Sequence, residues 1–163
     1  MSRQDDATAA DESDSAADAD ESDTGVDLDV LGDTPVLLFD GVCNLCNGAV
    51  QFVIERDDAG KIHFASLQSD AGARLLERAG LSPDQRETMV LVEGDDVYTK
   101  SSAAIRLAEL LGGVYRVATL GRVVPRFVRD RVYDFVAAHR YQWFGKKDQC
   151  MVPEEDVSGR FLD

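Results

Sequence analysis

Hydrophobic and polar positions divide the chain into a polar leader and, from about residue 34, a series of short strand-like and helix-like segments. Pro35-Val-Leu-Leu-Phe39 is a continuous apolar run, which is typical of a strand buried on both faces. Apolar residues recur at helical spacing between residues 44 and 57, and Gly60 ends that segment. Residues 61–65 alternate and predict a second strand, and residues 69–79 predict a second helix.

The following segments predict a short turn, a hairpin and a third helix. Ser82-Pro83-Asp84-Gln85 combines an N-cap serine with proline at the first helical position and therefore predicts one helical turn. Residues 88–92 and 97–99 flank the turn-forming Glu93-Gly94-Asp95-Asp96, as in a β-hairpin. We expect Ser101 or Ser102 to cap a helix that ends at Gly112 and buries one stripe of apolar residues: Ala104, Leu107, Ala108 and Leu111.

The predicted order, β-α-β-α-β-β-α, favours an α/β fold: a thioredoxin-like mixed four-stranded sheet with flanking helices. A C-terminal helical extension follows at about residues 113–152, with a helix predicted from Pro125 to His139. Its apolar stripe, which consists of Val128, Val132, Phe135 and Val136, is expected to pack into the core. We also expect Trp143 and Phe144 to pack on the domain.

The distribution of charge separates the first 33 residues from the rest. They hold twelve of the 31 acidic residues and one of the 17 basic residues, so most of the net charge of −14 belongs to this segment. We predict a disordered acidic tail over residues 1–33, a domain over 34–152 and a C-terminal tail over 153–163. The chain shows no signal-peptide pattern and no long apolar run, which favours a cytoplasmic location.

The chemistry suggested by the sequence lies in a C-x-x-C pair, Cys43 and Cys46, directly after the first predicted strand. A thiol at a helix N-terminus has a lowered pKa, because unpaired backbone N–H groups and the helix dipole stabilise the thiolate. Cys43 would therefore attack a disulfide, and Cys46, which we expect to be the more shielded, would resolve the mixed disulfide. No bound cofactor is needed for this exchange.

Two separated motifs resemble those of the DCC family of thiol-disulfide oxidoreductases. Asp40-Gly41-Val42-Cys43-Asn44-Leu45-Cys46 is similar to the D-G-x-C-x-x-C signature, and Arg140-Tyr141-x-x-Phe144-Gly145, followed by Cys150, is similar to the distal signature. The resemblance covers roughly residues 34–152 and implies a thioredoxin-like fold and a redox function. It does not define a substrate.

Four other residues are candidates for supporting roles. Asp40 shapes the turn or tunes the protonation of the thiols, and Gly41 meets a backbone need such as a positive φ. Thr88 stands near the position where thioredoxins carry a cis-proline that helps to dock substrate. Either Thr88 takes over part of that role, or substrate docks in a different way. Cys150 is either a packed residue or a third redox thiol.

Two alternatives to an oxidoreductase remain open. One is a zinc module using Cys43, Cys46, Cys150 and a histidine, His63 or His139. The other is a non-catalytic interaction domain with an arginine-rich helix, for which peripheral membrane contact is conceivable and nucleic-acid binding is not expected. For the oxidoreductase, the expected partners are protein or small-molecule disulfides and thiols and an unidentified thiol reductant.

Overall fold

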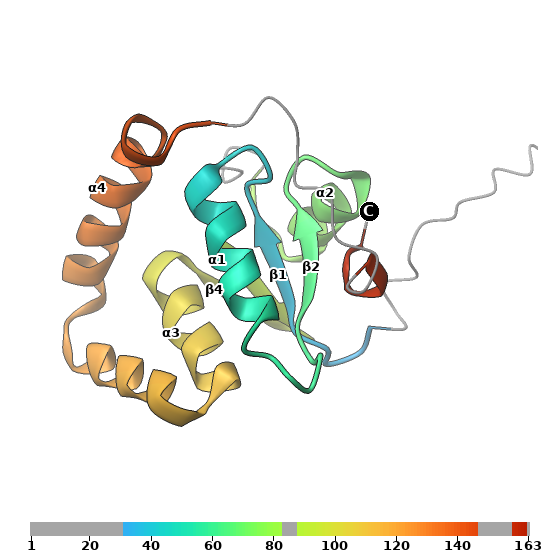
Figure 1. Cartoon of the computed structure of the whole chain (residues 1–163), viewed down its shortest axis with the longest axis horizontal. Helices are drawn as coiled ribbons and strands as arrows, with labels where there is room; N and C mark the ends of the chain where they lie inside the picture. Colours follow the sequence, from blue (N-terminus) through green and yellow to red (C-terminus); the bar gives the residue numbers. More distant parts are fainter. Residues whose placement is uncertain (1–30, 83–87, 147–157, 163) are drawn as a thin grey trace, which may run out of the picture.

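The computed structural model describes residues 31–82, 88–146 and 158–162 (Figure 1). The strands are β1 (Val36–Phe39), β2 (His63–Ser66), β3 (Val90–Glu93) and β4 (Asp96–Thr99). The helices are α1 (Asn44–Ile54), α2 (Asp70–Arg78), α3 (Lys100–Leu111) and α4 (Arg126–Phe144), together with the 3-10 helices η2 (Gly113–Val123) and η3 (Ser158–Arg160).

The four strands form one mixed sheet in the order β2-β1-β3-β4. β1 pairs with β2 in parallel, with Leu37 opposite Phe64, and pairs with β3 in antiparallel, with Leu38 opposite Val90. β3 and β4 form the predicted hairpin. This is the thioredoxin-like arrangement expected from the order of elements, and it places the carboxyl end of β1 and the start of β3 at the same edge of the sheet.

Each face of the sheet buries its own apolar cluster. Because side chains alternate along a strand, Val36 and Leu38 of β1 point to one face while Leu37 and Phe39 point to the other. The first face is covered by α2 through Leu75. On the opposite face lie α1 and α3, which contribute Val50, Val53, Ala103 and Leu107. The predicted burial of β1 on both faces is confirmed.

Helix α3 differs from the sequence expectation at its start and along its buried face. It begins at Lys100 after Thr99, with no side-chain cap, because β4 runs directly into the helix. Ser101 therefore lies inside the first turn and donates its hydroxyl hydrogen bond to Asp130. Ala104 is exposed, and the buried residues are Ala103, Ile105 and Leu107, since α3 packs both under the sheet and against η2. The burial of Leu107 and the end at Gly112 are as predicted.

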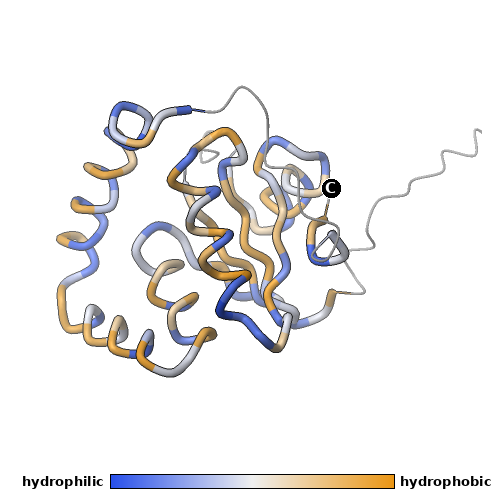
Figure 2. Tube along the Cα trace, in the orientation of Figure 1, coloured by the Kyte–Doolittle hydropathy of each residue, from blue (hydrophilic) through white to orange (hydrophobic). Residues whose placement is uncertain are grey.

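The C-terminal extension does not bury its apolar residues as expected. Helix α4 is longer than predicted, and three members of its apolar stripe are exposed: Val128 at 39%, Val132 at 62% and Phe135 at 56%. Trp143 and Phe144 are also exposed. In η2, with three residues per turn, the exposed Val114, Val117, Leu120 and Val123 fall on one row. Figure 2 shows these apolar positions along η2 and α4, the outermost part of the molecule.

Polar side chains instead attach α4 to the rest of the domain. Asp130 accepts from Ser101, and the hydroxyl of Tyr133 accepts the N–H of Met89 at 3.0 Å. Further contacts join Asp134 to Lys100 and Arg140 to Asp40. Positions 130, 133, 134 and 140 lie on one face of the helix, so α4 turns this polar face toward the rest of the domain. The apolar stripe lies on the opposite face of α4 and therefore points away from the core.

The last described residues return to the sheet. Leu162 donates its N–H to the carbonyl of Phe64 at 2.8 Å, and both Phe161 and Leu162 are buried. Arg160 pairs with Asp57. Most of the predicted acidic tail and the helical turn predicted at residues 82–85 lie outside the described residues. Within the described ranges, no helix is both long enough and apolar enough to cross a membrane.

Candidate thiol site

The cysteine pair lies at the edge of the sheet where β1 ends and α1 begins. Cys43 is the N-cap residue of α1, with extended backbone angles, and Cys46 lies in the first turn. The N–H of Cys46 donates to the sulfur of Cys43 at 3.3 Å. Both cysteines are free thiols in this structure. The predicted placement of the pair at a helix start is therefore confirmed.

The end of α4 covers Cys43. The backbone of Lys146 forms an antiparallel bridge with Cys43, and the side-chain amide of Asn44 donates to the carbonyl of Phe144 at 2.8 Å. Gly145 between them has a φ of +80°, and a Cβ there would come within 3.2 Å of the Asn44 amide nitrogen. The glycine of the distal motif thus permits the tight turn that brings the chain over the cysteine.

The order of exposure of the two thiols is the reverse of the expectation. Cys43 is 0% exposed, whereas Cys46 is half-buried. The expectation considered only the first turn of α1, where the second cysteine is the more shielded. It did not include the backbone at Lys146, which pairs with Cys43 from the distant end of α4.

Asp40 is the centre of a hydrogen-bond network beside the cysteines. Its carboxylate accepts the N–H of Val42 at 3.2 Å, the side-chain amide of Gln68 at 2.9 Å and the guanidinium of Arg140 at 3.0 Å. The hydroxyl of Tyr141 also donates to it. Asp40 is 3% exposed, so this set of donors compensates the burial of a charged group. The turn-shaping role expected of Asp40 is present, within a larger role.

The backbone of Gly41 is fixed by two other side chains. Its N–H donates to Gln68 at 3.0 Å, and its carbonyl accepts from the buried Asn47 amide at 2.9 Å. Gly41 is buried, and it is not among the described glycines with positive φ, so the expectation of a left-handed turn is wrong. These two hydrogen bonds use backbone atoms that other residues also have, so they do not by themselves explain a glycine here.

Burial and neighbouring charges set the protonation of the site. Burial, the largest cause, and the hydrogen bond and proximity to Cys43 together raise the pKa of the Cys46 thiol to about 12, although the positive charge of Arg140 opposes the rise. Burial, together with donation to Asp40, also raises the pKa of Tyr141 to about 12. At neutral pH both groups therefore keep their protons, and Tyr141 remains a donor to Asp40.

The remaining sequence candidates fall in different places. Thr88 is half-buried, and the antiparallel register between β1 and β3, extended by two residues, sets it level with Asp40. Cys150 lies outside the described residues. His63 is the first residue of β2 and pairs with the start of β1, at the end of the sheet opposite the cysteines. His139 stacks on Trp143. Among the described residues no group of three or more histidine, cysteine or acidic side chains is arranged to hold a metal ion.

Sequence reasoning missed the side chains that complete the network. Gln68 and Asn47 belong to no recognisable motif. Gln68 contacts Asp40 and Gly41, which are distant in sequence, and Asn47 reaches back from α1 to the carbonyl of Gly41. Arg140 and Tyr141 had a signal, since they form the first half of the distal motif. That motif is explained by the structure: its arginine and tyrosine reach Asp40, and its glycine forms the turn over Cys43.

Fold and site together define a thioredoxin-like domain with a C-x-x-C pair at the start of its first helix. The model of the DCC1-like thiol-disulfide oxidoreductase family matches residues 37–146. The chain belongs to this family. The match ends at Lys146, so it includes the polar attachment of α4 as well as the cysteines.

Two relatives support the assignment. YuxK of Bacillus subtilis (strain 168), an uncharacterized protein, is 54% identical over 127 residues, which cover 78% of this chain and 93% of YuxK. The chloroplastic DCC family protein At1g52590 of Arabidopsis thaliana is 45% identical over 117 residues, which cover 71% of this chain and 68% of the relative. No solved structure matches the chain.

Proposed function

We propose that the protein exchanges thiols and disulfides with protein or small-molecule partners through Cys43 and Cys46. The observation that carries the proposal is the N–H of Cys46 directed at the sulfur of Cys43 at the N-terminus of α1. A negative charge on this sulfur is stabilised by that hydrogen bond, by the helix dipole and by the nearby guanidinium of Arg140.

The proposed reaction moves two electrons from the cysteine pair to a disulfide. The Cys43 thiolate attacks one sulfur of the substrate disulfide, forms a mixed disulfide and releases one substrate thiolate. Cys46 then attacks the sulfur of Cys43, which forms the Cys43–Cys46 disulfide and releases the second substrate sulfur. The proton of Cys46 passes to a released thiolate. A separate thiol reductant restores the two thiols.

The burial of Cys43 adds a step to this scheme. A substrate sulfur cannot reach a fully buried thiol, so the backbone at Gly145 and Lys146 has to move away first. The contacts that hold this segment include the bridge to Lys146 and the hydrogen bond from Asn44 to Phe144. We therefore propose that the end of α4 controls access to the attacking thiol.

Trapping of mixed disulfides tests the assignment. In a Cys150→Ser background, Cys46→Ser should accumulate a mixed disulfide with oxidised glutathione on Cys43, and Cys43→Ser should form none and lose exchange activity. Intact mass after acid quenching and peptide mapping give the readout. If Cys43→Ser traps glutathione on Cys46 instead, the roles are interchanged. If both single variants keep full exchange activity, the cysteine pair is not the redox site.

A further inference from the structure

A cavity away from the cysteines is lined by three arginines. It has a volume of about 310 Å³ and lies between the β4 strand, the start of α3, the end of η2 and the start of α4. We call it the arginine pocket; its lining residues are Val97, Tyr98, Thr99, Ser102, Ile105, Arg122, Arg126 and Arg129. Arg129 and Arg140 are eleven residues apart on α4, so the pocket is about 16 Å along the helix from the thiol site.

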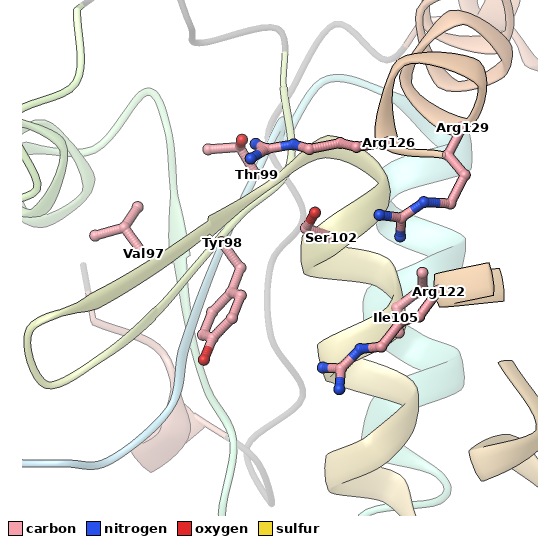
Figure 3. Close-up of a pocket in the computed structure, with 8 residues that line it drawn as sticks. All are labelled: Val97, Tyr98, Thr99, Ser102, Ile105, Arg122, Arg126 and Arg129. Carbon is pink, nitrogen blue, oxygen red and sulfur yellow. The ribbon is translucent and has the colours of Figure 1, made fainter. Parts of the chain in front are cut away.

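The three arginines line the pocket from α4 and η2. Figure 3 shows Arg126 reaching from α4 toward Thr99 and Arg129 reaching from α4 toward the first turn of α3, whereas Arg122 reaches from η2 to a point further along α3, beyond Ile105. The hydroxyl groups of Thr99 and Ser102 face them across the cavity. Positive charges that line one pocket repel one another, so an anion bound among them would lower the energy of the arrangement.

The carboxylates near the pocket engage only some of the N–H donors of the arginines. Glu109 accepts from one nitrogen of Arg122 at 2.9 Å, and Asp130 lies 3.4 Å from Nε of Arg126. Each guanidinium has five N–H donors, so most of those on these two arginines remain unused by the carboxylates. The side chain of Arg129 has no ion pair or hydrogen bond among the described residues, and its Nε is buried without an acceptor. Burial of an unsatisfied donor is costly, which favours an acceptor that comes from outside the described residues.

From this geometry we propose that the arginine pocket binds a phosphate group carried by a small organic molecule or by a lipid. Planar guanidinium groups pair with phosphate oxygens through two parallel hydrogen bonds, and several arginines together match a multiply charged anion. The cavity exceeds the size of a single carboxylate, and Val97, Ile105 and the ring of Tyr98 offer apolar surface to the organic part of the ligand. This site is separate from the proposed exchange reaction and does not depend on it.

Binding of pyrophosphate to the full chain tests the pocket. Isothermal titration calorimetry at constant ionic strength should show saturable binding at one site, and Arg129→Gln should weaken it by about tenfold or more, because charged hydrogen bonds are lost. The affinity of Arg129→Lys, which keeps the charge without the paired donors, should fall between the affinities of the wild type and Arg129→Gln. Arg131→Gln is the matched control: Arg131 is exposed on α4 and does not line the pocket, so affinity should change less than about twofold.

Two arms identify the source of the phosphate. If vesicles of phosphatidylcholine with phosphatidic acid bind the wild-type chain, and if Arg129→Gln or excess pyrophosphate removes that binding, the ligand is a lipid headgroup. If pyrophosphate binds and the vesicles do not, the ligand is a soluble phosphate compound. The proposal is overturned if pyrophosphate does not bind, or if Arg129→Gln and Arg131→Gln weaken binding equally. Circular dichroism and thermal unfolding verify that each variant is folded.

Discussion

The guanidinium of Arg140 lies 3.0 Å from the carboxylate of Asp40, although the two residues are one hundred positions apart in the sequence. Their side chains are 4% and 3% exposed. This pair connects the loop before the cysteines to the inward face of α4, and so it joins the C-x-x-C motif and the distal motif into one site. A buried pair of this kind makes the removal of one partner costly, because the other charge is left without compensation.

We therefore expect Asp40→Ala to lower the free energy of unfolding by about 3–5 kcal/mol. The exposed pair between Lys100 and Asp134 is the control, since both side chains are at least 35% exposed. Asp134→Ala should cost less than about 1 kcal/mol. Urea denaturation of the reduced protein measures both values. Equal losses in the two variants would show that the Asp40–Arg140 pair does not act as a buried ion pair.

The protonation of Cys46 predicts a pH dependence of the reduced protein. The pKa of Cys46 rises from 9.0 to about 12 on folding, so the folded chain keeps a proton that the unfolded chain loses. Stability from this group is complete below pH 9 and is lost as the pH rises toward 12. Tyr141, with a pKa raised from 10.0 to about 12, acts in the same direction.

Unfolding as a function of pH checks this expectation. The free energy of unfolding should fall above pH 9 in the Cys150→Ser protein and should fall less steeply in a Cys46→Ser, Cys150→Ser protein. The ultraviolet absorbance of the thiolate in a Cys43→Ser, Cys150→Ser protein reports on Cys46 alone. A thiolate signal that is complete by pH 9 in this variant would contradict the effect of burial, which is the largest cause of the shift.

Local patterns predicted the sheet well and the C-terminal region poorly. The apolar run of β1 and the alternation in β2 depend on neighbouring residues, and the strands form where those patterns indicate. The position of the cysteine pair at the start of α1 was also predicted, because the cysteines follow β1 closely in the sequence. The turn conformation at Gly41, however, depends on Gln68 and Asn47, which fix its backbone through side chains that no local pattern identifies.

Helix α4 shows the limit of periodicity. Val132 and Phe135 recur at helical spacing, and this predicts the helix but not the direction in which the stripe points. The direction is set by Asp130, Tyr133 and Arg140, whose partners come from three other parts of the chain. Similarly, the buried Cys43 has a backbone contact with Lys146, which is distant in sequence and which no local pattern predicts.

The outward stripe of α4 predicts a small response to polar substitution. Val132 is 62% exposed, whereas Val53 in α1 is 1% exposed. Val132→Ser should change the free energy of unfolding by less than about 0.5 kcal/mol, since little burial is lost. Val53→Ser should cost about 2 kcal/mol or more, because it removes packing and buries a hydroxyl. If Val132→Ser costs as much as Val53→Ser, the stripe is buried in solution and the inward polar face is wrong.

A pair of helical glycines gives a sharper test of the packing between α2 and β2. A Cβ on Gly72 would lie 2.0 Å from the carbonyl oxygen of Ser66, and backbone at this position cannot move aside without shifting the helix. Gly72→Ala should therefore destabilise the protein by about 3 kcal/mol, at the upper end of the cost of overpacking. Gly48 in α1 is exposed and has nothing within 4 Å of an added Cβ.

At Gly48 the same substitution should act in the opposite direction. Gly48→Ala adds a good helix former without a clash, so we expect the free energy of unfolding to rise by about 0.5–1 kcal/mol. The two alanine variants differ only in surroundings, which makes urea denaturation of the pair a direct measurement of the contact at Ser66. Tolerance of alanine at Gly72 would mean that α2 lies further from the sheet than the carbonyl contact requires.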